Sequence, residues 1–174
     1  GVTLAALLET VILNHIPGVL WFPGVAVIEE TIKIAIVWWL ARSLKAYYLR
    51  DGMVLGACVG FGFAAFETSG YAFNALIQAD DTKILPVVET QLVRGLLTPV
   101  GHGLWTALLA GALFAAASKT GKLHISWSVV GWWFVVVLLH WVWDASTGLA
   151  VVFTLLSTGN PVTLTGFETG KLVD

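Results

Sequence analysis

Residues 24–42 read GVAVIEETIKIAIVWWLAR, an apolar stretch that is long enough to form a membrane-spanning helix. Glu29, Glu30 and Lys33 lie inside it. A bilayer tolerates ionisable side chains only where they are paired or line a polar cavity, so these three indicate a functional site. Lys33 is four residues from Glu29 and three from Glu30, within reach of either on a helix. A buried structural ion pair is the simpler alternative.

Polar residues recur in the later apolar segments, at Glu67, His102, His140 and Asp144. Each charged residue costs about 2.5–3.5 kcal/mol at mid-membrane, so the helices must offset this cost by bringing the groups into contact. Tyr71 lies one turn from Glu67 on the same helix face. Asp144 lies one turn after His140, where its carboxylate can fix the imidazole tautomer. The sequence therefore predicts a polar cluster inside a membrane bundle.

The composition excludes an ordinary soluble domain. The chain is 57% hydrophobic and 11% charged, with a mean hydropathy of +0.85, whereas globular proteins carry about 25% charged residues. Its net charge of −2 provides no basic patch, so we expect no nucleic-acid partner. The single cysteine, Cys58, excludes an internal disulfide and most thiolate metal sites.

The hydropathy pattern predicts an all-α, polytopic integral membrane bundle forming a single domain over residues 1–174. Since Gly1 is not an initiator methionine, we expect some N-terminal sequence to precede it. Thr98 and Pro99 are typical of a helix start. A sixth membrane element is an alternative, as an interfacial or re-entrant helix at 83–95. The five predicted spans cover about 2–20, 23–42, 52–77, 97–118 and 127–156.

The loop charges predict how the chain is oriented in the cell membrane. Positive charge concentrates in the connections 42–51 and 119–124, which the positive-inside rule places in the cytoplasm. The connection 78–94 and the C-terminus are then outside. This orientation puts the polar residues of the predicted cluster between the midplane and the outer surface.

Four motifs resemble, in order, those of the PrsW family of membrane-embedded proteases, which shares a superfamily with the CAAX prenyl endopeptidases. The similarity extends over nearly all of residues 23–144. It implies an all-helical protease that cleaves a single-pass, membrane-anchored regulatory protein, such as an anti-sigma factor, near the outer face. The motifs are VIEETIK (27–33), DGMVLGACVGFGFAAFE (51–67), RGLLTPVGHGLWTALLAG (94–111) and LHWVWD (139–144).

The same resemblance implies roles for individual residues. Glu29, Glu30 and His102 match residues that are essential in the family, Glu67 matches its second carboxylate, and His140 matches its last histidine. Arg94, Pro99 and Thr106 match a less specific pattern. The chain departs from the family at Thr68 and Asp144, where asparagine is common.

Carboxylates and histidines together suit peptide hydrolysis by an activated water, with or without a metal. In the metal-free hypothesis, Glu29 or Glu30 is the base and His102 positions the water or protonates the leaving amine. His140 polarises the scissile carbonyl, and Glu67 completes the hydrogen-bond network.

In the metal-dependent hypothesis, His102, His140 and one carboxylate, Glu67, hold a divalent ion such as zinc and leave one position open for water. The residues do not decide between the two forms of catalysis. Two non-enzymatic alternatives also use such a cluster: a membrane scaffold that binds partner transmembrane helices, and a proton- or ion-coupled carrier. The five predicted spans contain no recognisable inverted repeat, which argues against the carrier.

Overall fold

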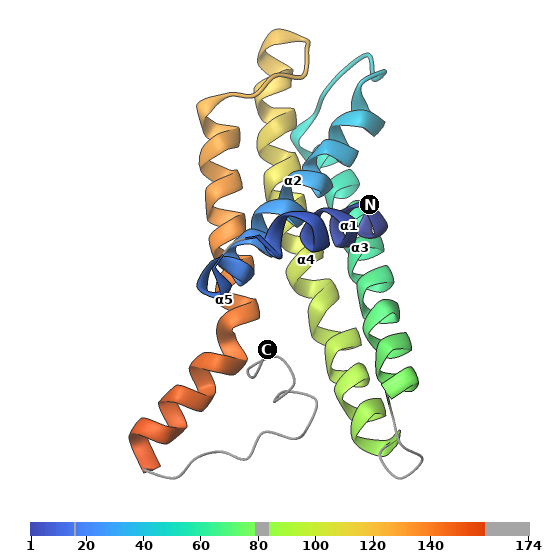
Figure 1. Ribbon diagram of the computed structural model, residues 1–174. Coiled ribbons are helices and arrows are strands. Elements are labelled where there is room, and N and C mark those ends of the chain that lie inside the picture. Colours follow the sequence, from blue (N-terminus) through green and yellow to red (C-terminus); the bar gives the residue numbers. More distant parts are fainter. Residues whose placement is uncertain (16, 79–83, 159–174) are drawn as a thin grey trace. The chain divides into compact units, whose positions relative to one another are not determined.

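The computed structural model describes residues 1–15, 17–78 and 84–158, and the regular secondary structure among them is entirely helical (Figure 1). No strand occurs among these residues. The predicted all-α class is therefore confirmed. The helices are α1 (Val2–Leu13), the short 3-10 helix η1 (Gly18–Leu20), α2 (Trp21–Ala41), α3 (Leu49–Gln78), α4 (Ile84–Thr120) and α5 (Trp127–Thr158).

Among the described residues, three stretches are long and apolar enough to cross a membrane, by length and composition: Leu49–Phe73, Val100–Thr120 and Trp127–Ser146. α2 has 21 residues and so reaches about 30 Å, the thickness of a bilayer core. Its charged residues are buried, whereas large apolar side chains such as Trp39, Phe66 and Phe134 are exposed. Polar groups inside and apolar groups outside are typical of a helical membrane bundle, which confirms the predicted architecture.

The predicted first span, 2–20, is not one continuous helix. α1 ends at Leu13 and has 12 residues, about 18 Å, which is short of a bilayer core. The following segment contains Pro17, which has no backbone N–H to continue the helical ladder, and the chain resumes as η1. Figure 1 shows α1 running across the direction of α3 and α4. The number of crossings stays a prediction.

The helix predicted to start at Thr98 in fact starts earlier. α4 is continuous from Ile84 to Thr120, so the segment 84–95 is its first part and not a separate interfacial helix. Pro99 lies inside α4, where the loss of one N–H is tolerated because membrane helices can satisfy the freed carbonyl elsewhere. Residues 79–83 of the predicted outer connection lie outside the described residues.

Glycines on one face of α3 let its backbone touch α4. A Cβ at Gly52 would meet Phe114, one at Gly56 would lie 2.6 Å from the Ala110 Cβ, and one at Gly60 would collide with the carbonyl of His102. The spacing of four residues repeats along one face, as in the small-xxx-small packing of membrane helices. This contact sets the distance between the two helices that carry Glu67 and His102.

Two apolar clusters surround α2. One contains Val37 of α2, Leu109 and Leu113 of α4 and Val136 of α5. The other joins Ala5, Ile32 and Phe63 from α1, α2 and α3. Contacts within the chain group it into two compact units, Gly1–Trp141 and Val142–Asp174. Both clusters lie in the first unit, whereas the predicted single domain 1–174 stays a prediction.

Replacing Gly60 by alanine is expected to destabilise the protein although alanine favours helix. The added Cβ has no room against the His102 carbonyl, and overpacking of this kind costs about 1–3 kcal/mol. The matched control is Gly62→Ala on the same helix, where no atom lies within 4 Å of the added Cβ. Thermal unfolding of both variants in detergent measures the difference. Equal stability of the two variants would contradict the close packing of α3 on α4.

Candidate functional site

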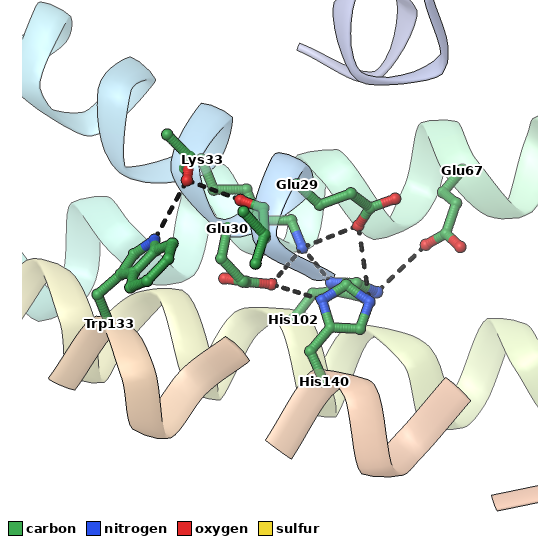
Figure 2. Close-up of polar contacts among 9 residues, drawn as sticks. Glu29, Glu30, Lys33, Glu67, His102, Trp133 and His140 are labelled. Atoms are coloured by element: carbon green, nitrogen blue, oxygen red, sulfur yellow. Dashed lines mark hydrogen bonds and ion pairs between the residues drawn. The ribbon is translucent and has the colours of Figure 1, made fainter. Parts of the chain in front are cut away.

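Six of the ionisable residues singled out in the sequence meet inside the Gly1–Trp141 unit (Figure 2). The four elements that carry them are widely separated in sequence but converge on one point. Glu30 and Lys33 have no exposed surface, and His102 and His140 are each 2% exposed. The cluster consists of Glu29, Glu30 and Lys33 from α2, Glu67 from α3, His102 from α4 and His140 from α5.

The ammonium of Lys33 lies at the centre of the cluster. It donates to Glu29 Oε2 at 3.2 Å, to Glu30 Oε1 at 2.7 Å and to Nδ1 of His102. It also lies 4.3 Å from the ring centroid of Phe63, within cation–π range. Lys33 therefore pairs with both carboxylates of its own helix and joins α2 to α4.

His102 contacts a different partner through each ring nitrogen. Nδ1 accepts from Lys33, and Nε2 lies 3.2 Å from Glu67 Oε2. A neutral imidazole has one N–H and one lone pair, so these partners assign the proton to Nε2 and the lone pair to Nδ1. Lys33 can only donate, so it fixes the lone pair on Nδ1, and the carboxylate of Glu67 lies on the side of Nε2.

His140 has a comparable arrangement with the carboxylates of α2. Its Nδ1 lies 2.9 Å from Glu30 Oε1, and its Nε2 lies 3.8 Å from Glu29 Oε2. With Nδ1–H donating to Glu30, the lone pair is on Nε2 and faces Glu29. Each histidine thus has one nitrogen held by a carboxylate and the other turned toward Glu29 or Lys33.

Glu29, His102 and His140 form a group that could hold a metal ion. Their ligand atoms all lie within 4.8 Å of one another, and all three residues are buried. One carboxylate and two imidazoles are a donor set that catalytic zinc sites use. Metal-binding histidines usually have a carboxylate at their second nitrogen, and here Nδ1 of His140 contacts Glu30 Oε1 at 2.9 Å while Nε2 of His102 lies 3.2 Å from Glu67 Oε2. The residues therefore fit a divalent metal.

The carboxylate in this group differs from the one that the sequence suggested. The predicted ligand set named Glu67, but the group with short mutual distances contains Glu29. Glu67 instead contacts the outward nitrogen of His102. Helical periodicity gives the face on which a carboxylate lies, but the rotation of α2 against α3 decides which one lies nearest to both histidines.

The remaining supporting residues predicted from the sequence are not part of the described cluster. Tyr71 is partly buried, one turn after Glu67 in α3. Arg94 lies in α4, and its side chain is outside the described residues. Asp144 belongs to the Val142–Asp174 unit, so its predicted role in orienting His140 stays a prediction.

The aromatic part of the site was missed in the sequence. The ring of Trp105 lies 5.6 Å from that of His102 and 5.4 Å from that of His140, measured between centroids. The two histidine rings are themselves 4.9 Å apart and nearly perpendicular. The available signal was spacing, since Trp105 follows His102 by three residues and so shares its helix face.

Residues 1–165 match the family described as PrsW family intramembrane metalloprotease, which is nearly the whole length. No curated protein and no solved structure matches the chain. The match covers well over half of the chain. The apolar helices described above agree with a hydrolase that is embedded in the membrane and acts on membrane proteins. The chain therefore belongs to the PrsW family of intramembrane metalloproteases.

Proposed function

We propose that this membrane protease hydrolyses a peptide bond of a single-pass membrane protein, close to the outer face, at a metal site formed by Glu29, His102 and His140. One observation carries the proposal: the buried donor group, in which each histidine is held by a further carboxylate. A group of this kind is costly to bury. A metal ion bound to all three donors would offset this cost, which accounts for their burial at one point.

In this proposal the atoms facing the metal are Glu29 Oε2, His102 Nδ1 and His140 Nε2. Glu67 and Glu30 hold the opposite nitrogens of the two histidines, which keeps both rings oriented. A divalent ion such as zinc supplies Lewis acidity toward water and the scissile carbonyl when it is bound there. Three protein ligands leave a position for substrate or water.

Glu30 is the residue that best fits the general base. Its Oε1 contacts Lys33 and His140, but its Oε2 is buried and has no hydrogen-bond partner among the described residues. That oxygen can accept a proton as water attacks the carbonyl carbon. When the C–N bond breaks, the same proton passes to the leaving amine, so the water is divided between the two products.

Substrate class and orientation rest on the sequence. The basic connections 42–51 and 119–124 favour a cytoplasmic location, which places the connection 78–94 and the C-terminus outside. The cluster is then nearer the outer surface. The resemblance to the family favours a regulatory, membrane-anchored substrate such as an anti-sigma factor.

Glu30→Gln is expected to abolish substrate cleavage while leaving the fold intact. Glutamine has nearly the same shape but is a poor proton acceptor, and loss of a general base lowers rates by about 10²–10⁴-fold. The measurement is sequencing of new protein N-termini in membranes of cells that carry wild-type or variant protein. Fragments should appear with the wild type only.

His124→Ala is the matched control for this experiment, with His102→Ala as the site variant. His124 is partly exposed, and its ring contacts the hydroxyl of Thr120 and the carbonyl of Lys122, outside the cluster. The control should give the wild-type fragments at equal expression, and the His102 variant should not. Cleavage that persists in both Glu30→Gln and His102→Ala would overturn the assignment of the site.

Glu67→Ala is expected to weaken metal binding without removing a ligand. Loss of the carboxylate behind a metal-binding histidine typically costs about 10–100-fold in metal affinity. The metal affinity of Glu67→Gln should lie between those of the wild type and Glu67→Ala, since its amide oxygen can still accept from His102 Nε2–H. Zinc affinity of the purified proteins, measured by competition with a chromogenic chelator, tests this. Loss of all zinc in Glu67→Ala, with zinc retained in Glu29→Gln, would favour Glu67 as the ligand.

A further inference from the structure

Lys33 already occupies the position of a cation in the donor group. Its ammonium contacts Glu29 Oε2 and His102 Nδ1, which are two of the three atoms that face the proposed metal. The side chain is fully buried. Its remaining partners are Glu30 and the ring of Phe63. A fully buried lysine is rare unless it is paired, and this one is paired with the metal donors themselves.

The ammonium and a metal ion compete for the same electrons. His102 has a single lone pair, on Nδ1, because that nitrogen accepts from the ammonium of Lys33, which can only donate. Donation from Lys33 uses that lone pair, and a metal ligand needs the same one. A monovalent and a divalent cation a few ångströms apart also repel each other strongly in a buried site. Both cations therefore cannot hold His102 and Glu29 together.

We propose that Lys33 is a built-in counter-cation that holds the donors in the metal-free protein and that metal binding displaces it from Glu29 and His102. The inference rests on the proposed metal site. After displacement the ammonium keeps Glu30, its nearest carboxylate at 2.7 Å. No covalent bond changes, since one cation replaces another at two donor atoms.

This exchange serves a purpose that the burial of the site makes necessary. In the absence of metal, the carboxylates of Glu29 and Glu30 would lie side by side in a low-dielectric interior, where unpaired charges are costly. The ammonium of Lys33 offsets that cost and keeps the donors in place until metal arrives. The same contacts must be broken on loading, so Lys33 lowers the metal affinity.

Lys33→Met is expected to raise the affinity for zinc by at least about 10-fold, within the range common for coupling between two ligands. Methionine has a similar length but no charge, so metal binding no longer has to displace a cation. Lys33→Arg keeps the charge and should not bind zinc more tightly than the wild type. Lys45→Met removes an exposed lysine from the connection after α2 and serves as the control, with unchanged affinity.

The measurement is the zinc dissociation constant of each purified protein in detergent, obtained by chelator competition. Thermal unfolding in EDTA and in zinc gives a second readout: Lys33→Met should be less stable than the wild type without metal and gain more on adding zinc. If Lys33→Met does not fold without metal, Lys33→Gln, which is neutral but can still donate, should show the same direction of change.

Zinc affinity that is unchanged or weaker in both Lys33→Met and Lys33→Gln, with zinc bound by the wild type, would overturn the inference and leave the metal site standing. Lysine would then be an orienting residue. Failure of the wild type and of every Lys33 variant to bind zinc, manganese or cobalt would instead remove the metal site and the inference with it. Tighter zinc binding by Lys33→Met than by the wild type and Lys33→Arg would support the exchange.

Discussion

The ion pairing of Lys33 with Glu29 and Glu30 is the constraint on which the rest of the structure depends. In a bilayer these charges must be satisfied by protein, because no water is present to solvate them. Lys33 donates to both carboxylates of its own helix and to His102 of α4. α2 therefore has to lie inside the bundle, and its apolar residues on either side of the charges join two different clusters.

The packing of α3 against α4 provides the second requirement, a fixed distance between Glu67 and His102. Gly60 lies against the carbonyl of His102, and Glu67 follows Gly60 by seven residues, about two turns along nearly the same face. Without a Cβ at Gly60 the two backbones approach closely enough for Glu67 to reach His102 Nε2 at 3.2 Å. A packing feature thus determines an interaction in the site.

Much of the site could be predicted because charges inside apolar helices are costly, which limits where they can be placed. Glu29, Glu30, Lys33, His102 and His140 were identified from sequence for this reason, and the structure brings them together. The pairings could not be predicted, since they depend on how each helix is rotated against its neighbours. The predicted start of α4 was wrong. Pro99 is a helix-start signal in soluble proteins, yet membrane helices tolerate proline in their interior.

The adjacent glutamates illustrate why two carboxylates at successive positions need not duplicate each other. On a helix they point about 100° apart, yet their long side chains let both reach Lys33 and His140. They reach different atoms: Glu29 faces His140 Nε2 at 3.8 Å, and Glu30 faces Nδ1 at 2.9 Å. One glutamate therefore lies beside the lone pairs of the histidines, while the other holds a ring N–H and keeps one oxygen without a partner among the described residues. The two glutamates of α2 therefore have different surroundings, although they are adjacent in sequence and both contact Lys33.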